Sequence, residues 1–328
     1  MNIDLNIFPV AWYAVTWSKE LGNKPIKVRL LGKDYVLFRD EKGIVRCLNA
    51  YCPHRGADLS LGFCHGGQLQ CAYHGWRFEG DGTCVSIPAH PNKPVPSMAH
   101  ARSYPVREAA SLIWLYPQQV ENEETLPPLG LFKDLYDDQY TFTPTMVTWQ
   151  AHVTRVVESI LDMTHLHFVH RKTIGRYMKP TLDQFSFTVE GNNWDIHVDG
   201  AHIEFIFPQH MILRRPWGGK RSFINYYCFT PIDENQSKVF CVTGRNFARH
   251  IPGMNKFFMS YNLKIFNEDK PIVESQNPIS IPEMMQLEVH VDSDGPQVRY
   301  RQRWYQFLQN KLEPRIDVHE QRLNILRS

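Results

Sequence analysis

The chain has 328 residues, of which 43% are hydrophobic, and its formal net charge is +2 at pH 7. This length suggests two domains, or one large one with an ample core, and the composition excludes a disordered protein. A net charge so near zero gives no reason to expect nucleic acid or an acidic membrane as a partner.

The cysteines and the first residues of the chain indicate the cellular compartment. Seven cysteines is an odd number, and the sequence offers no disulfide framework for five of them: Cys47, Cys64, Cys84, Cys228 and Cys241. The opening Met1-Asn-Ile-Asp lacks the basic region of a signal peptide, and no apolar run approaches membrane-spanning length. We therefore expect a soluble protein in the reducing cytoplasm, with no membrane as partner.

Residues 1–118 have the pattern of short strands separated by turns. Apolar or alternating segments lie between glycine-containing turns and begin at Trp12, Ile26, Tyr35, Ile44 and Ser111. This pattern predicts an all-β N-terminal domain over residues 1–118, with two candidate ligand loops at its end.

Two ligand pairs mark those loops. Cys52-Pro53-His54 and Cys71-Ala72-Tyr73-His74 each combine one cysteine with one histidine. Two Cys and two His suit either a tetrahedral zinc ion or a [2Fe–2S] cluster in which two His replace two Cys on one iron. A zinc finger more often pairs Cys with Cys and His with His. The mixed pairs favour the cluster, because each loop can then give one ligand to each iron.

From residue 119 onward the pattern changes to mixed helix and strand, after a linker-like Glu121-Asn-Glu-Glu and Pro127-Pro128. Helices are expected over residues 151–168 and 252–276. Strands are expected at Phe185–Val189, Trp194–Val198, His202–Phe207, Phe223–Phe229 and Val239–Gly244. We assign residues 119–328 to a second domain.

The helix expected over residues 151–168 carries a polar stripe. Glu158, Asp162 and His165 lie at i, i+4 and i+7 on one face, and His170 follows five residues after His165. A spacing of five does not share a regular helical face, so the helix must end or bulge if both imidazoles are to converge. For this segment alone, a solvated acidic stripe with two incidental histidines is the other interpretation.

The second helix places a carboxylate on an apolar face. A buried face is predicted by apolar residues at helical spacing, which are Met254, Phe257, Phe258, Tyr261, Ile265 and Ile272. Asp269 falls on this face, and Pro271 should kink the helix beside it. Burying an unpaired carboxylate costs on the order of several kcal/mol, so Asp269 needs a cation or strong hydrogen-bond donors. The alternative is a bond to a core Arg, Tyr or backbone amide.

Two His and one carboxylate with open positions form the facial triad of non-haem Fe(II) oxygenases. Together with the two loops, these residues resemble the oxygenase component of the Rieske non-haem iron oxygenases over nearly the whole chain. The family pattern Glu-Asn-x-x-Asp-x-x-His-x-x-x-x-His appears from Glu158 to His170, with Ser159 in place of the usual Asn. That change removes an amide near the iron, and its effect stays open. Glu268-Asp269 matches the family's third ligand.

The resemblance implies a role for each matching residue. The [2Fe–2S] cluster is bound by Cys52, His54, Cys71 and His74. The mononuclear Fe(II) is bound by His165, His170 and Asp269. Asp162 is the catalytic residue that links His165 to His74 of the partner subunit and carries electrons between the two centres of a homotrimer. The implied fold class is α+β, an all-β Rieske domain plus a helix-grip (START-like) catalytic domain with a curved antiparallel sheet.

The sequence has no Gly-x-Gly-x-x-Gly after a strand and no plant-type ferredoxin Cys run. We therefore expect electrons from NAD(P)H to arrive only through a separate reductase or ferredoxin, with O₂ as co-substrate. Length and C-terminal pattern resemble the short, alpha-only branch that includes vanillate O-demethylase and dicamba demethylase. Stretches beginning at Glu274, Glu288 and Tyr300 also resemble the saxitoxin-pathway hydroxylases.

The expected function is that of a monooxygenase which hydroxylates, or N- or O-demethylates, a small aromatic or heterocyclic molecule. The alternatives are a ring cis-dihydroxylating dioxygenase and, from another class, a Rieske electron-transfer protein or a zinc-binding module without oxygenase activity. Pocket walls are expected from His202–Leu213, Asn225–Phe229, Met254, Phe258 and Tyr261, although such residues are more often plain core. Structural roles are expected for His152 and His167, and a turn for His290, Asp292 and Asp294.

Overall fold

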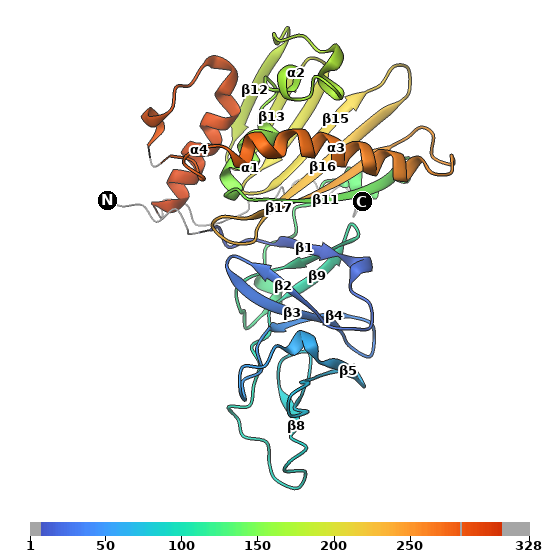
Figure 1. Cartoon of the computed structure of the whole chain (residues 1–328), viewed down its shortest axis with the longest axis vertical. Coiled ribbons are helices and arrows are strands. Elements are labelled where there is room, and N and C mark those ends of the chain that lie inside the picture. Colours follow the sequence, from blue (N-terminus) through green and yellow to red (C-terminus); the bar gives the residue numbers. More distant parts are fainter. Residues whose placement is uncertain (1–7, 283, 310–328) are drawn as a thin grey trace. The chain divides into compact units, whose positions relative to one another are not determined.

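The computed structural model describes residues 8–282 and 284–309, which divide into two compact units (Figure 1). One unit is Val10–Leu126, and the other runs from Pro127 onward and includes Phe8 and Pro9. The first unit thus extends past the predicted boundary at residue 118 and leaves out these two residues. The outermost parts of both predicted domains, residues 1–7 and 310–328, lie outside the described residues.

The unit Val10–Leu126 contains three small antiparallel sheets with the orders β1-β10-β9, β2-β3-β4 and β5-β6-β7-β8. Its strands are β1 (Tyr13–Trp17), β2 (Ile26–Leu30), β3 (Lys33–Arg39), β4 (Val45–Asn49), β5 (Phe63–His65), β6 (Gln68–Gln70), β7 (Arg77–Phe78), β8 (Cys84–Ser86), β9 (Val106–Ala109) and β10 (Leu112–Leu115). The helical segments described in this unit are short 3₁₀ turns. The prediction of an all-β N-terminal domain is confirmed.

One of the cores of this unit reaches the predicted ligand loops. Phe38, Leu69 and Phe78 are fully buried and belong to the same apolar cluster as Cys52 and Cys71. The two thiols therefore lie on the core side of their loops, where packing fixes their positions.

The second unit is built on a seven-stranded antiparallel sheet with the order β11-β17-β16-β15-β14-β13-β12. Its strands are β11 (Thr141–Trp149), β12 (Phe185–Glu190), β13 (Asn193–Val198), β14 (Ala201–Ile206), β15 (His210–Pro216), β16 (Ser222–Pro231) and β17 (Ser237–Arg245). Its helices are α1 (Val153–Leu161), α2 (Leu166–Val169), α3 (Met254–Glu274) and α4 (Gly295–Leu308). Figure 1 shows the long α3 lying across one face of this sheet, as the helix-grip prediction requires. The described helices include none with the length and apolar character that crossing a membrane requires.

Three elements differ from the prediction. The helix expected over residues 151–168 stops at Leu161, and α2 begins only at Leu166. Strands β11 and β15 were not predicted. Pro144 and alternating threonines conceal β11 in the sequence, and the proline is tolerated because β11 is an edge strand.

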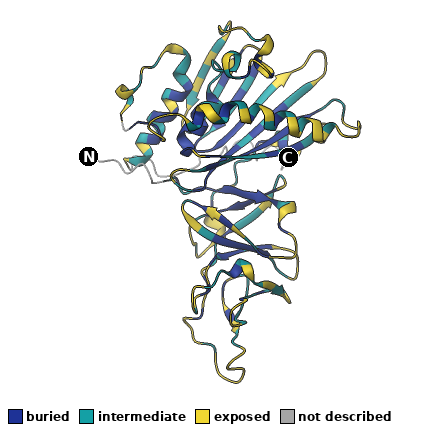
Figure 2. Ribbon diagram, viewed as in Figure 1, coloured by how far each residue is buried: buried dark blue, intermediate teal, exposed yellow. Residues whose placement is uncertain are grey.

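The buried face of α3 is also rotated from the predicted one. Phe257 and Ile272, which were expected inside, are 60% and 55% exposed. The residues buried instead, at i, i+4, i+7 and i+11, are Asn262, Phe266, Asp269 and Val273. Figure 2 shows the long α3 with exposed and buried residues alternating along its length. The spacing of apolar residues does not predict this face, because the face includes the polar Asn262. The Asn262 amide donates hydrogen bonds to Thr145 and Thr243 on the sheet. Asp269 is buried, as predicted.

A network of two buried arginines, the buried Glu158 and the partly exposed Glu288 ties α1 to α4. The Arg301 guanidinium donates to both oxygens of Glu158, and its Nη2 lies 2.6 Å from Glu288 Oε2. Arg155 Nη2 lies 2.7 Å from Glu288 Oε1. Burial acts to raise the pKa of Glu288, but its hydrogen bonds to Arg155 and Arg301 outweigh that effect and lower the pKa to about 2. Each buried charge therefore has an opposite charge beside it.

We expect Arg301→Met to destabilise the fold strongly, because it leaves the buried Glu158 without its bidentate partner. The cost of breaking such a buried pair is about 3–5 kcal/mol, which should appear as a clear fall in Tm. The matched control is Arg299→Met on the same helix, since Arg299 is exposed and bonds only Gln302 among the described residues. Equal Tm values for the two variants would contradict the structural role given to the network.

Candidate active site

The two predicted cluster loops share one backbone pattern. The Gly56 N–H donates to the Cys52 carbonyl over 2.9 Å, and the Gly75 N–H donates to the Cys71 carbonyl over 3.0 Å. Gly56 and Gly75 have φ values of 70° and 73°, in the left-handed region that favours glycine. Each loop therefore needs a glycine four residues after its cysteine.

The four predicted cluster ligands lie together on these loops. Cys52 and Cys71 are buried, and His54 Nδ1 lies 3.1 Å from His74 Nδ1. Burial raises the pKa of the Cys52 thiol to about 11, and the neighbouring Cys71 contributes in the same direction. The backbone N–H groups of His54 and Arg55 oppose this shift by donating toward the sulfur. Two thiols and two facing imidazole nitrogens are a donor set that fits a [2Fe–2S] cluster.

The break between α1 and α2 brings the second set of ligands together. Asp162, directly after α1, has an extended backbone, with φ −78° and ψ 128°. His165 and His170 flank the short α2. Ligand atoms of His165, His170 and Asp269 all lie within 4.8 Å of one another. The helix end that the spacing required is therefore present.

Both imidazoles direct Nε2 at the same carboxylate oxygen. Asp269 Oδ1 lies 3.1 Å from His170 Nε2 and 3.5 Å from His165 Nε2. Each Nδ1 faces a different carboxylate, with His165 3.3 Å from Asp162 Oδ2 and His170 3.0 Å from Glu268 Oε2. A carboxylate at Nδ1 orients the ring and leaves Nε2 as the metal-binding atom.

The electrostatics of this group favour a cation. Burial acts to lower the pKa of His165, but the hydrogen bonds and charges of Asp162 and Asp269 outweigh it and raise the pKa to about 9. Burial acts to raise the pKa of Asp269, but His165 and His170 outweigh it and lower the pKa. With neutral imidazoles, these two carboxylates and Glu268 would share a small volume uncompensated. Two nitrogens and one oxygen that converge there fit Fe(II) with open positions.

A cavity of about 150 Å³ adjoins this group. Asp162, His165, His170 and Asp269 form one side of it. The other walls are largely apolar and include Met178, Leu182, Met211, Leu213, Phe223, Ile265 and Phe266. The cavity therefore suits an apolar molecule held against the three convergent ligand atoms.

Away from the three ligand residues and Asp162, the apolar lining is interrupted by two amides, Asn225 and Asn262, and by the charged side chains of Asp199 and Arg215. Asn262 Nδ2 donates to Thr243 Oγ1 over 2.9 Å, and that hydroxyl donates to Asn225 Oδ1 over 2.6 Å. This chain of hydrogen bonds fixes both amides on the wall. They can therefore recognise a polar atom on the edge of a bound molecule.

The cavity agrees in part with the walls expected from the sequence. The predicted strand segments contribute Met211, Leu213, Asn225 and Tyr227. The contribution expected from Met254, Phe258 and Tyr261 is wrong, because α3 lines the cavity with Asn262, Ile265 and Phe266. Met178 and Leu182 were missed, since they lie in a connection without helical or strand periodicity.

The other singled-out histidines and acids have structural partners. His152 Nδ1 accepts the Thr154 N–H at the start of α1, and His167 Nδ1 lies 2.6 Å from the Met178 carbonyl. His290 Nε2 lies 3.1 Å from the Met285 carbonyl. Asp292–Asp294 is a 3₁₀ turn before α4, in which Asp294 accepts the Val291 N–H.

Comparison with known proteins agrees with this architecture. Residues 11–105 match the Rieske [2Fe-2S] domain, and residues 149–202 and 201–309 match the vanillate O-demethylase oxygenase C-terminal domain. The chain is 30% identical over 251 residues to the 4beta-methylsterol monooxygenase of Methylococcus capsulatus, which covers 70% of this chain and 67% of that protein. The chain belongs to the Rieske oxygenases. It is therefore an oxidoreductase with a [2Fe–2S] domain.

Other relatives of this Rieske oxygenase carry demethylase names. Dicamba O-demethylase, oxygenase component, of Stenotrophomonas maltophilia is 35% identical over 164 residues, 49% of this chain and 47% of that protein. Methylxanthine N1-demethylase NdmA of Pseudomonas putida is 27% identical over 300 residues, 86% of this chain and 80% of that protein. A solved NdmA structure superposes with a TM-score of 0.81 at 24% identity, covering 92% and 90% of the two chains. Family membership implies a small-molecule substrate and a separate reductase.

Glu268, which the sequence marks only as the neighbour of Asp269, accepts hydrogen bonds from both His170 and Thr173. We expect Glu268→Ala to lower the affinity of the His165, His170 and Asp269 group for Fe(II) by about 10- to 100-fold, because His170 loses its orienting partner.

The matched control is Asn267→Ala, an exposed position one residue earlier on α3. Iron titration of cluster-loaded protein measures the affinity, and the visible absorption of the cluster should not change in either variant. Equal affinities for the two variants would contradict an orienting role for Glu268.

Proposed function

We propose that this Rieske oxygenase is a monooxygenase that hydroxylates a small aromatic or heterocyclic molecule and, at an N- or O-methyl carbon, thereby demethylates it. The observation that carries the proposal is the convergence of two imidazole Nε2 atoms and one carboxylate oxygen at one side of a mostly apolar cavity. The demethylase names of two relatives support the same reaction.

His165, His170 and Asp269 would hold the mononuclear Fe(II), and the cluster would be held by Cys52, His54, Cys71 and His74. When bound, these two groups supply the electrons and the metal site for activating O₂. Asp162 and Glu268 orient the rings of His165 and His170 through contacts at their Nδ1 atoms. The apolar walls exclude water and hold the methyl-bearing carbon of the substrate beside the three ligand atoms.

Asp162 would also serve the electron path between chains. Its Oδ1 accepts hydrogen bonds from the N–H and the hydroxyl of Thr164, both at 2.7 Å, and its Oδ2 faces His165. The Asp162 side chain remains 27% exposed, so a donor from another chain can reach it. In the proposed homotrimer, His74 of the partner subunit donates to Asp162, and the carboxylate joins the two centres.

The volume of the cavity favours some of the substrates named for the relatives over others. One relative is a methylsterol monooxygenase, whereas others are named for dicamba and methylxanthine. Pockets for drug-sized ligands enclose roughly 300–1,000 Å³. A cavity of about 150 Å³ suits a molecule of one or two rings better than a four-ring sterol. Asn225 and Asn262 suit a substrate with a polar edge.

Electron supply completes the proposal. NAD(P)H would act through a separate reductase, directly or through a ferredoxin. The cytoplasmic location expected from the cysteines stays a prediction.

The test is a screen of methylated aromatics and N-methyl heterocycles with purified protein and a surrogate reductase. We expect formaldehyde and products that carry one added oxygen atom. Asp269→Ala should keep the visible absorption of the cluster, lose about one iron per chain and form no product, because the facial triad lacks its carboxylate. Asn267→Ala, an exposed position on the same helix, should keep both iron and activity.

Three outcomes would contradict the proposal. Diols that carry both atoms of O₂ would make the protein a dioxygenase. Turnover of sterols alone would overturn the argument from cavity size. Full iron content and activity in Asp269→Ala would overturn the assigned metal ligands.

A further inference from the structure

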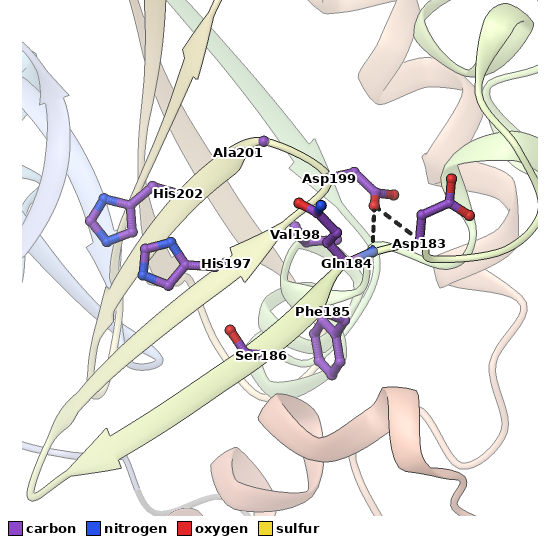
Figure 3. A pocket seen from close by; sticks show the side chains of 10 residues that line it. Asp183, Gln184, Phe185, Ser186, His197, Val198, Asp199, Ala201 and His202 are labelled. Atoms are coloured by element: carbon purple, nitrogen blue, oxygen red, sulfur yellow. Dashed lines mark hydrogen bonds between the residues drawn. The ribbon is translucent and has the colours of Figure 1, made fainter.

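A second group of potential metal ligands lies on β13 and β14, on the face of the sheet turned away from the cavity. Successive side chains of a strand point to opposite faces. Val198 and Ala201 line the cavity, so the neighbouring His197 and His202 lie on the outer face, together with Asp195. Figure 3 shows the two imidazole rings side by side on their adjacent strands.

These three side chains lie close together. His197 and His202 are directly opposite each other in the strand register, and their rings stack with centroids 4.6 Å apart and an interplanar angle of 5°. Asp195 Oδ1 lies 2.8 Å from His197 Nε2, and Asp195 Oδ2 lies 3.1 Å from His202 Nε2. One ligand atom from each residue lies within 4.8 Å of the other two.

We propose that Asp195, His197 and His202 form a second metal site, which takes a divalent ion of the zinc class. Zn²⁺ binds imidazole nitrogen and carboxylate oxygen at about 2.0–2.2 Å, and a tetrahedral site then holds its ligand atoms roughly 3.3 Å apart. Asp195 Oδ1 to His197 Nε2 and Asp195 Oδ2 to His202 Nε2 are both shorter than that separation, so side-chain rotation is needed to place one Asp195 oxygen and both Nε2 atoms around an ion. Each neutral imidazole would bind the ion through Nε2 with its proton on Nδ1, and water would complete the coordination. Two imidazoles disfavour Ca²⁺ and Mg²⁺, which prefer oxygen ligands.

The surrounding charges permit a cation. Glu204 lies opposite Asp195 in the strand register, but its carboxylate is paired with Arg214. Arg214 lies opposite His202 on the next strand and would repel an ion. Its guanidinium is, however, bonded to Glu204 at 2.6 Å and to Asp134 at 2.7 Å, so acids already compensate its charge.

The site would fix a wall of the catalytic cavity. A tight turn of Asp199 and Gly200, both with positive φ, connects β13 to β14. The residues on either side of it, Val198 and Ala201, line the cavity. An ion that bridges the outer face of both strands therefore restrains this hairpin. The metal site stands on its own geometry, whereas this consequence for substrate binding rests on the proposed function.

The experiment is equilibrium dialysis of the iron-loaded, cluster-loaded protein against Zn²⁺, with zinc and iron counted together. We expect about one zinc per chain in addition to the retained iron. His197→Gln and His202→Gln should each weaken zinc binding by about tenfold or more, since each removes one of three protein ligands. The control His250→Gln changes an exposed histidine of the same unit and should bind zinc as the parent does.

The site must also be distinguished from zinc exchange at the catalytic ligands. Asp269→Ala should still bind the outer zinc, and loss of oxygenase activity in that variant would leave this result unchanged. Zinc should raise the Tm of the parent and of His250→Gln, but not of His202→Gln. The proposal is overturned if His197→Gln and His202→Gln bind zinc with parental affinity, or if the parent takes up no zinc while it keeps its iron.

Discussion

One buried carboxylate oxygen that faces two imidazoles is the constraint on which the catalytic unit depends. Asp269 sits on the sheet-facing side of α3, so its position is set by the helix packing on the sheet. His165 reaches it only because α1 stops at Leu161, and the network around Arg301 holds α1 in place. The packing of α3, the end of α1 and the Arg301 network together position the three ligand atoms beside the cavity.

Each of the two proposed metal-binding regions leaves one residue of the proposed electron path accessible. In the Rieske domain the thiols face the core, while His74 lies exposed at the loop surface. In the catalytic unit Asp162 keeps part of its surface accessible beside His165. The proposed electron path between chains needs an accessible group on each side, and the exposure of His74 and Asp162 meets that requirement.

Much of this was predictable from the sequence, because ligand chemistry and spacing are local properties. The mixed Cys and His pairs, the required helix break and the buried Asp269 all follow from residue types at short separation. The phase of α3 did not follow, because the sheet selects Asn262 for the inside through hydrogen bonds to threonines. Strand β11 was concealed by Pro144 at a sheet edge. The outer pair His197 and His202 follows from the register that the Asp199-Gly200 turn fixes, a local signal that the predicted strands alone do not use.

The central claim is that Asp162 joins the two centres, and Asp162→Asn tests it most directly. In single-turnover experiments with reduced protein, substrate and O₂, the variant should keep both kinds of iron while its cluster reoxidises much more slowly than that of the parent. An amide retains the size of the carboxylate and can still accept a hydrogen bond from His165, so iron loading measured on the same sample separates a broken link from a disturbed metal ligand. Reoxidation at the parental rate, with both centres fully loaded, would contradict the account.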